Sequence, residues 1–306
     1  MTEPVRWPRD VRPEIVARTS SSLTIRMTRE PQRPRLYHYT SGRGLKGIVE
    51  NRELWATHIY FLNDHSEYVG TFNVIKGLLP RRTVIRELLP KVPHLQKAVE
   101  GLHPFERGRL PCIFVTCFSE ERDDLSQWRG YTKPGDGYAV GFDLERLKAR
   151  ATDAGYRLEK VEYGEDGIAT PEFRLIPLLQ ELFTNYAENG PDTEERAKEA
   201  VDTARLQIQE FAPLVKDWAF HGENEWRLIS PLFDYETTKF EFREGASFLV
   251  PYVKFDLGRL DSELVPEMVT GPGPNIDLAQ QAAKVLAIQN GIDIHPGQAQ
   301  APYRSW

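Results

Sequence analysis

The chain has 306 residues, of which 40% are hydrophobic and 27% are charged, and its formal net charge is -6. This composition is typical of globular proteins, and the length suffices for one large domain or two smaller ones. No apolar run is long enough to span a membrane, and the N-terminus lacks the apolar core of a signal peptide, so we expect a cytoplasmic protein without membrane contact.

The charge is unevenly distributed along the chain. Residues 1–35 contain eight Arg and four acidic residues, a net +4 that leaves -10 for the remainder. We therefore predict a basic N-terminal extension over residues 1–34 and a single domain over residues 35–306. A basic segment beside an acidic body is compatible with contact to nucleic acid, but the bulk charge gives such binding no support.

The first part of the predicted domain alternates short strands with helices. "RPRLYHYTS" is typical of a strand that ends at Ser41, and "LWATHIYFLND" is typical of a second strand. Between them a helix is indicated by apolar residues at helical spacing, namely Leu45, Ile48 and Val49. Another helix is expected to begin at Asn63 or Asp64, because both residues are favourable N-caps.

The middle of the chain combines a helical insertion, two strands and further helix. Residues 80–110 are charged and contain prolines, which indicates helices joined by loops. "LPCIFVTCFS" and "GDGYAVGFD" predict strands, and "DDLSQWRGYT" predicts a short helical turn closed by Gly130. Residues 171–216 are predicted to be helical. Their core-facing stripe is Ala197, Val201, Ala204, Ile208, Phe211 and Val215.

The two cysteines lie in one predicted strand. Cys112 and Cys117 are separated by an odd number of positions, which places them on opposite faces of a strand. A disulfide or a shared metal is therefore not expected. We predict that both pack as small apolar residues.

The stretch "HGENEWRL" has charged residues at every second position. In a strand, Glu223, Glu225 and Arg227 would share one face, while Trp226 and Leu228 would be buried on the other. The two carboxylates would stand about 7 Å apart. Such a face is either a solvated surface with a salt bridge or one wall of an active site.

The C-terminal part adds a strand in "SFLVPYVKFDL" and a helix in "GPGPNIDLAQQAAKVLAIQNG", which ends at a Gly. The chain is rich in strands, with helices between them but without regular β-α alternation. This order favours an α+β fold over a doubly wound sheet.

Several common nucleotide, hydrolase and metal motifs are absent from the sequence. It contains no G-x-G-x-x-G after a strand, no G-x-x-x-x-G-K-[ST], no G-x-S-x-G and no H-E-x-x-H. Asp64, His65 and Glu67 lie close together, but acidic residues are expected at the start of a helix because of its dipole. We therefore predict no metal site.

Three blocks in order carry a resemblance. "LYHYTS", "TCFSEERDDLSQWRGYT" with "GYAVGFD", and "ENEWRLI" resemble a bacterial family known as domain of unknown function 2971. "LWATHIYFLNDHSE" and "PYR" are also similar to that family. The resemblance extends from about residue 35 to the C-terminus. The family name implies no activity.

The same blocks resemble, more loosely, the ADP-ribosyltransferase superfamily. In that superfamily a His or Arg lies on a first strand, and a catalytic Glu on a late strand often closes an E-x-E pair. The resemblance implies an α+β fold of ADP-ribosyltransferase-like mixed sheets flanked by helices, with NAD as the substrate. It implies that Glu225 is catalytic, that Glu223 orients the substrate, and that His38 occupies the first-strand position.

The roles that the resemblance implies are chemically reasonable. Cleavage of the nicotinamide–ribose bond develops positive charge on the ribose, which a carboxylate stabilises. The implied NAD-binding residues are His38, Tyr39, Ser126, Trp128, Arg129 and Tyr131. Trp128 and Tyr131 would stack on nicotinamide, Ser126 would orient Glu225, and Arg129 would meet the diphosphate.

The sequence departs from the superfamily at two places. No Gly-Thr follows His38, and the aromatic motif has three candidates, which are Tyr60, Tyr131 and Tyr138. Structural roles are the alternatives for each residue. His38 would then bond a backbone carbonyl, Trp128 would pack in the core, and Arg129 would form an ion pair.

We therefore predict an NAD-dependent ADP-ribosyltransferase or NAD glycohydrolase. The macromolecular acceptor, nucleic acid or protein, is unidentified, and the resemblance implies a role in phage defence or as a toxin. One alternative is a Mg²⁺-dependent nuclease that uses Asp64, Glu223 and Glu225. Another is a non-catalytic module that binds a nucleotide or a partner.

Overall fold

The computed structural model describes residues 11–19, 22–29, 33–62, 66–104, 112–132, 137–164, 174–234 and 236–301. The chain forms two compact units, Met1–Pro34 and Arg35–Trp306. In the first unit, strands β1 (Val11–Thr19) and β2 (Ser22–Arg29) pair as an antiparallel hairpin. No strand or helix was predicted from the sequence for this segment.

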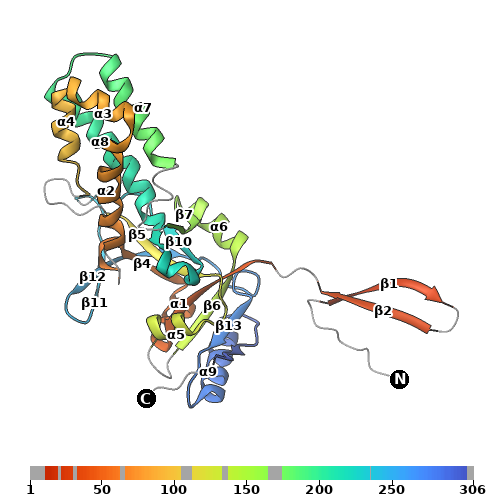
Figure 1. The fold of residues 1–306 in the computed structure, drawn as a ribbon. Helices are drawn as coiled ribbons and strands as arrows, with labels where there is room; N and C mark the ends of the chain where they lie inside the picture. Colours follow the sequence, from red (N-terminus) through yellow and green to blue (C-terminus); the bar gives the residue numbers. More distant parts are fainter. Residues whose placement is uncertain are drawn as a thin grey trace. The chain divides into compact units, whose positions relative to one another are not determined.

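The second unit is built on one large sheet (Figure 1). Its strands lie in the order β11-β12-β4-β5-β3-β6-β13-β14, and β10 pairs with both β5 and β7. The pairs in this order are antiparallel except for β13 and β14. The bounds are β3 (Arg35–Ser41), β4 (Glu53–His58), β5 (Phe114–Ser119), β6 (Gly137–Asp143), β7 (Arg157–Lys160), β10 (Glu225–Ile229), β11 (Glu241–Glu244), β12 (Leu249–Asp256), β13 (Glu267–Thr270) and β14 (Gly297–Gln298). Two further strands, β8 (Glu162–Gly164) and β9 (Val215–Asp217), form a separate parallel pair.

The sheet opens at its centre, beside β5. Along one edge of β5, strand β10 pairs continuously from Ser119 to Val115. On the other edge, β4 pairs with the first two residues of β5, and β3 pairs only at Ser119. Among the described strands, residues 116–118 have no strand partner on that edge. Strands β3 and β4 therefore diverge and leave an opening in the sheet.

Helices cover the sheet and also form a separate group. Figure 1 shows α2, α3, α4, α7 and α8 gathered together, and they share one apolar core that includes Val115 and Ile229 of the sheet. Helices α1, α6 and α9 contribute to a second core, which contains Leu45, Leu147 and Ala283. The bounds are α1 (Gly42–Asn51), α2 (Ser66–Leu78), α3 (Thr83–Leu88), α4 (Pro93–Glu100), α5 (Leu125–Tyr131), α6 (Leu144–Asp153), α7 (Ile176–Glu188), α8 (Glu194–Phe211) and α9 (Ile276–Gln289). This mixed sheet flanked by helices confirms the predicted α+β class.

The strand β3 and the helix α1 were predicted in detail. Ser41 ends β3 and caps α1, because its hydroxyl accepts the backbone N–H of Gly44 at 3.2 Å. The buried residues of α1 are those of the predicted stripe, Leu45, Ile48 and Val49. The helix ends at Asn51, and its C-cap Arg52 has φ 59° in the left-handed region.

Two predicted elements near the site differ from the structure. The helix expected to reach residue 216 ends at Phe211, because Pro213 interrupts it, and Val215 begins the short strand β9. Glu223 was expected in a strand but ends the 3-10 helix η7 (Trp218–Glu223). Asn224 then adopts the left-handed conformation at φ 43°, which Asn tolerates better than most residues, and the strand starts only at Glu225.

Other boundaries differ less. Helix α5 continues through Gly130 to Tyr131. The expected N-cap at Asn63 or Asp64 lies outside the described residues. In the described parts of the chain, no helix is long and apolar enough to cross a bilayer.

Candidate functional site

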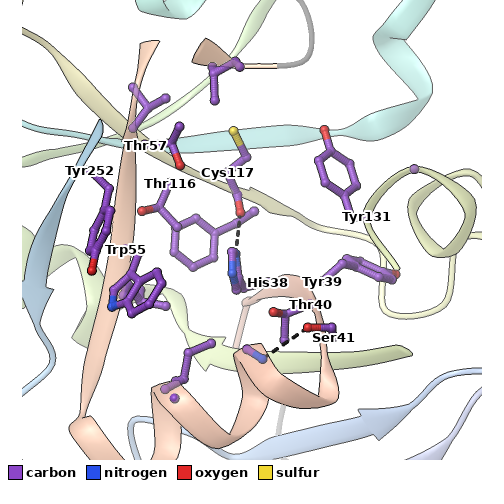
Figure 2. A pocket seen from close by; sticks show the side chains of 18 of the residues that line it. His38, Tyr39, Thr40, Ser41, Trp55, Thr57, Thr116, Cys117, Tyr131 and Tyr252 are labelled. Carbon is purple, nitrogen blue, oxygen red and sulfur yellow. Dashed lines mark hydrogen bonds between the residues drawn. The ribbon is translucent and has the colours of Figure 1, made fainter. Parts of the chain in front are cut away.

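A cavity of about 1300 Å³ lies at the opening of the sheet. Its walls come from β3, α1, β4, β5, α5, β9, β10, β11 and β12, so segments that are far apart in the sequence meet there (Figure 2). Six of the predicted site residues line it, namely His38, Tyr39, Ser126, Tyr131, Glu223 and Glu225.

Lys216 joins the two glutamates of the "HGENEWRL" stretch. Its Nζ donates to Oε2 of Glu223 and to Oε2 of Glu225, each at 2.9 Å. The side chain of Glu225 is only 4% exposed and that of Lys216 7%, whereas that of Glu223 is 20% exposed. The carboxylates therefore converge although Glu223 is not in the strand, and Glu223 is the more accessible of the two.

Arg227 fixes Glu225 from the same strand face. Its Nε donates to Oε1 at 2.7 Å and its Nη2 donates to Oε2 at 3.1 Å. Arg227 also donates to the carbonyl of Pro213 at 2.8 Å. The ion pair is buried and has two hydrogen bonds, whereas one alternative from the sequence was an exposed salt bridge.

The environment keeps Glu225 ionised. Burial alone would raise the pKa of its carboxyl, but the charge and hydrogen bonds of Arg227, together with Lys216, outweigh burial and hold the pKa at about 2. The thiol of Cys117 also donates to this carboxylate. Burial, followed by the charge of Glu225, raises the pKa of Cys117 well above its ordinary value, so this cysteine is a protonated hydrogen-bond donor. Cys117 was predicted only to pack as a small apolar residue, but it also donates a hydrogen bond to Glu225.

His38 points into the opening of the sheet. Its Nδ1 lies 2.9 Å from the carbonyl oxygen of Cys117 (Figure 2). Because a carbonyl only accepts, Nδ1 carries the proton, and in the neutral ring Nε2 is an acceptor. Burial lowers the pKa of His38, which favours this neutral form. His38 therefore bonds a backbone carbonyl, as its structural alternative predicted, and it also lines the cavity.

Ser126, Tyr39 and Tyr131 line the cavity in different ways. The hydroxyl of Ser126 donates to Asp124 at 2.9 Å, so it does not orient Glu225 as the resemblance implied. The hydroxyl of Tyr39 is engaged with the backbone of Glu121 and Asp124. Tyr131 is 41% exposed and lines the cavity, so it is the one of the two rings predicted to stack on nicotinamide that lies there.

Trp128 and Arg129 are not brought to the cavity. Trp128 is fully buried, its indole N–H donates to Asp123 at 2.7 Å, and its ring packs edge-on against Tyr39. Burial on the inner face of α5 thus places Trp128 in the core instead of beside a ligand. Arg129 is exposed on the same helix and does not line the cavity. Tyr60 and Tyr138, the other candidates for the aromatic motif, do not line it either.

Within the described residues, no group of three or more His, Cys, Asp or Glu side chains is arranged to hold a metal ion. Asp64 and His65, and the side chain of Glu67, lie outside those residues. Between Glu223 and Glu225, the position that a shared cation would take holds the ammonium of Lys216.

Further residues that were not predicted from the sequence lie at the cavity. Lys216 is one of them, and its only sequence signal is a Lys directly after the apolar run "APLV". The others are basic and aromatic residues that line the cavity, namely the exposed Arg43, Lys46, Trp55 and Arg243 and the buried Tyr252. Trp55 was assigned to a strand, but its exposure depends on tertiary packing that periodicity does not reveal.

Comparison with known proteins gives a partial match. A ribosomal protein L11 methyltransferase from Rhizobium etli (strain CIAT 652) is 25% identical over 111 residues, which are 36% of this chain and 33% of the relative. This chain therefore spans about a third of the length of that curated relative. No solved structure matches the chain. Residues 127–228, which contain Tyr131, Lys216, Glu223 and Glu225 but not His38, match the family described as "Protein of unknown function (DUF2971)".

Proposed function

We propose that the cavity binds NAD and that the protein cleaves the nicotinamide–ribose bond, passing ADP-ribose to a macromolecular acceptor or to water. The observation that carries this proposal is the convergence of His38, Glu223 and Glu225 on one cavity. A volume of about 1300 Å³ accommodates a ligand as large as a dinucleotide.

The two glutamates have different parts in this proposal. Positive charge develops on the ribose as nicotinamide leaves, and a fixed carboxylate next to the sugar lowers the energy of that state. Glu225 supplies an ionised carboxylate whose position is set by Arg227 and Lys216. Glu223 shares Lys216 but is more exposed, so it is the carboxylate that reaches the sugar most directly.

The other polar groups of the cavity suit the remaining parts of NAD. Nε2 of His38 is an acceptor for a ribose hydroxyl. Arg43 and Lys46 lie on the first turns of α1 at the cavity, where the helix N-terminus also favours the negative charge of a diphosphate. They take the part that the resemblance gave to Arg129. The exposed ring of Tyr131 takes the part given to Trp128.

The proposal includes an ADP-ribosyltransferase-like fold. This fold is supported by the opening between β3 and β4 along one edge of β5. His38 lies on β3 at that edge, and Glu225 lies on β10, which pairs with the other edge of β5. The acceptor, nucleic acid or protein, and a role in phage defence or as a toxin remain predictions.

The test compares matched glutamate variants. Purified protein is incubated with NAD in EDTA, and nicotinamide is quantified for wild type, Glu223→Gln, Glu225→Gln and Glu199→Gln. Glu199 is an exposed residue of α8 away from the cavity, so its substitution serves as the control. We expect Glu223→Gln and Glu225→Gln to lose activity roughly 10²–10³-fold, as when one electrostatic group is removed from an active site.

Folding is monitored in parallel, because Glu225 is buried. Circular dichroism and thermal unfolding of Glu223→Gln, whose side chain is partly exposed, should remain close to wild type. Full activity in a folded Glu223→Gln and a folded Glu225→Gln would contradict the proposal. Saturable NAD binding without any product would instead indicate a non-catalytic module.

A further inference from the structure

A residue in the left-handed conformation separates the two glutamates of the cavity. Asn224 has φ 43° and ψ 50°, and among the described residues other than glycine only Arg52 also has a positive φ. In a regular strand, Glu223 and Glu225 would stand about 7 Å apart on one face. The left-handed turn instead takes Glu223 out of β10, and its carboxylate bonds the same ammonium of Lys216 as the carboxylate of Glu225, each at 2.9 Å. The convergence of the two carboxylates therefore depends on the backbone of the residue between them.

The surroundings fix the backbone of this turn completely. All its polar groups, from the carbonyl of Glu223 to the carbonyl of Glu225, are hydrogen-bonded at distances of 2.7–3.3 Å. Their partners, in chain order, are the hydroxyl of Ser119, the carbonyl of His221, the N–H of Glu120, the hydroxyl of Tyr163 and the N–H of Val161. A residue in a sparsely populated backbone region persists only where its surroundings fix it, and such residues are concentrated at functional sites.

The side chain of Asn224 connects the turn to the strand that carries His38. Its Nδ2 donates to Oε1 of Glu121 at 2.9 Å. The carbonyl of Glu121 accepts from the hydroxyl of Tyr39 at 2.7 Å, and Tyr39 is adjacent to His38 on β3 (Figure 2). Neither Asn224 nor Glu121 lines the cavity. Asn224 therefore acts through its neighbours and not on a ligand.

We propose that Asn224 is a positioning residue of the site. Its left-handed conformation directs the carboxylate of Glu223 to Lys216 at the cavity, while Arg227 holds Glu225 in β10. Glycine adopts this conformation freely and asparagine tolerates it, whereas a β-branched residue does not. The inference rests on the proposed function for its effect on catalysis, but the convergence of the two carboxylates can be measured without NAD.

The activity test compares substitutions that differ in their tolerance of a left-handed backbone. Nicotinamide release from NAD is measured for wild type, Asn224→Gly and Asn224→Val, with Arg52→Gly and Arg52→Val as matched controls. Arg52 has φ 59°, but it is the C-cap of α1 and does not line the cavity.

The expected result is a loss that follows the backbone conformation. We expect Asn224→Val to lose about 10²-fold in kcat, as when a catalytic group is displaced by about 1 Å. Its KM for NAD should stay close to wild type, because the residues proposed to bind the nucleotide are unchanged. Asn224→Gly should keep kcat within a few-fold of wild type, although it lacks the side-chain bond to Glu121. Both Arg52 variants should keep the wild-type kcat.

The coupling between Lys216 and Glu223 gives a readout that needs no NAD. Thermal unfolding is measured for Lys216→Met, Glu223→Gln and the double variant, each in the wild-type, Asn224→Gly and Asn224→Val backgrounds. We expect the two shifts in Tm to be non-additive in wild type and in Asn224→Gly, because the two residues are bonded, and additive in Asn224→Val. If Asn224→Val does not fold, Asn224→Ala takes its place, since alanine also disfavours the left-handed backbone.

The two readouts distinguish this inference from the proposed function. If wild type releases nicotinamide and a folded Asn224→Val does so equally fast, the positioning role is refuted and the proposed function stands. The positioning role is also refuted if Asn224→Gly or Arg52→Val loses as much kcat as Asn224→Val. If wild type releases no nicotinamide, the proposed function fails and the coupling decides. Coupling that disappears in Asn224→Val then supports the positioning role, and coupling that persists there overturns it.

Discussion

Glu225 and Arg227 form a doubly hydrogen-bonded ion pair within one strand, with donor–acceptor distances of 2.7 and 3.1 Å. Alternate residues of a strand point to the same side, so the sequence spacing brings these side chains together. Both are buried, and Lys216 adds a second positive charge to the carboxylate. The fold itself thus holds the Glu225 carboxylate in place, as the electrostatic catalysis that we propose requires.

The first prediction concerns acid stability. The pKa of Glu225 is lowered from 4.5 to about 2 in the folded protein, so the unfolded chain binds more protons between these values. The stabilisation from Glu225 is therefore complete above about pH 4.5 and is lost as the pH falls toward 2, and it amounts to about 3 kcal/mol. Urea unfolding at several pH values measures it.

The comparison for this prediction is Glu225→Gln. We expect the difference in unfolding free energy between wild type and Glu225→Gln to be largest near pH 7 and to shrink below pH 4.5. Glu199→Gln should show a difference that stays small throughout. A wild type to Glu225→Gln difference that is independent of pH would show that Glu225 is not held ionised by its partners.

The second prediction concerns Lys216. Lys216→Met leaves two carboxylates without their shared cation, and we expect a loss of about 3–5 kcal/mol in unfolding free energy, as when one partner of a buried pair is removed. Lys198→Met, which breaks an exposed pair with Asp202, should cost less than about 1 kcal/mol.

A double substitution tests the coupling within the cluster. Adding Glu223→Gln to Lys216→Met removes the negative charge that has lost Lys216 as its partner, whereas Glu225 keeps Arg227, so it should restore about 1–2 kcal/mol. Simple additivity of the two substitutions would mean that Lys216 does not bridge Glu223 and Glu225.

The third prediction separates stability from ligand binding on α1. Gly47 lies within the helix and lines the cavity, and a Cβ added there meets no atom within 4 Å. Gly47→Ala should therefore raise the unfolding free energy by about 0.5–1 kcal/mol. The proposed function puts NAD against α1, so the added methyl group should weaken NAD binding.

Gly70→Ala is the matched control for Gly47→Ala. Gly70 lies in α2, and a Cβ there also meets nothing within 4 Å, but Gly70 does not line the cavity. We expect a similar gain in thermal stability with unchanged NAD binding. Equal NAD affinity in both variants would place the ligand away from α1.

The fourth prediction concerns the protonation of His38. Because Nδ1 donates to the carbonyl of Cys117, ¹⁵N NMR should show the Nδ1–H tautomer at neutral pH. Burial lowers the pKa, so the titration midpoint should lie below 6.5, and protonation of the unfolded chain should destabilise the fold as the pH falls from 6.5. A midpoint above 6.5 or an Nε2–H tautomer would contradict this geometry.

The local elements near the site were largely predictable from sequence. The stripe of Leu45, Ile48 and Val49 predicted α1, since periodicity depends only on neighbouring residues. The strand that contains Glu225 and Arg227 was predicted for the same reason, and so was their shared face. The predicted position of Glu223 was wrong, because η7 and the left-handed Asn224 interrupt the alternation.

The assembly of the site was less predictable. Lys216 lies on a three-residue strand inside a segment expected to be helical, and such short strands depend on tertiary pairing. Trp128 looked equivalent to Tyr131 on α5, but one is buried and the other exposed, because the helix packs one side against β3. The opening of the sheet beside Thr116 follows from the divergence of β3 and β4, which no local pattern encodes.

The most direct measurement is the release of nicotinamide from NAD by the wild-type protein in EDTA, alone and with cell extract or candidate DNA and RNA as acceptors. We predict that nicotinamide accumulates with time and that EDTA has no effect, since the proposed chemistry uses only the carboxylates, His38 and their partners. No release under any of these conditions would contradict the proposed function.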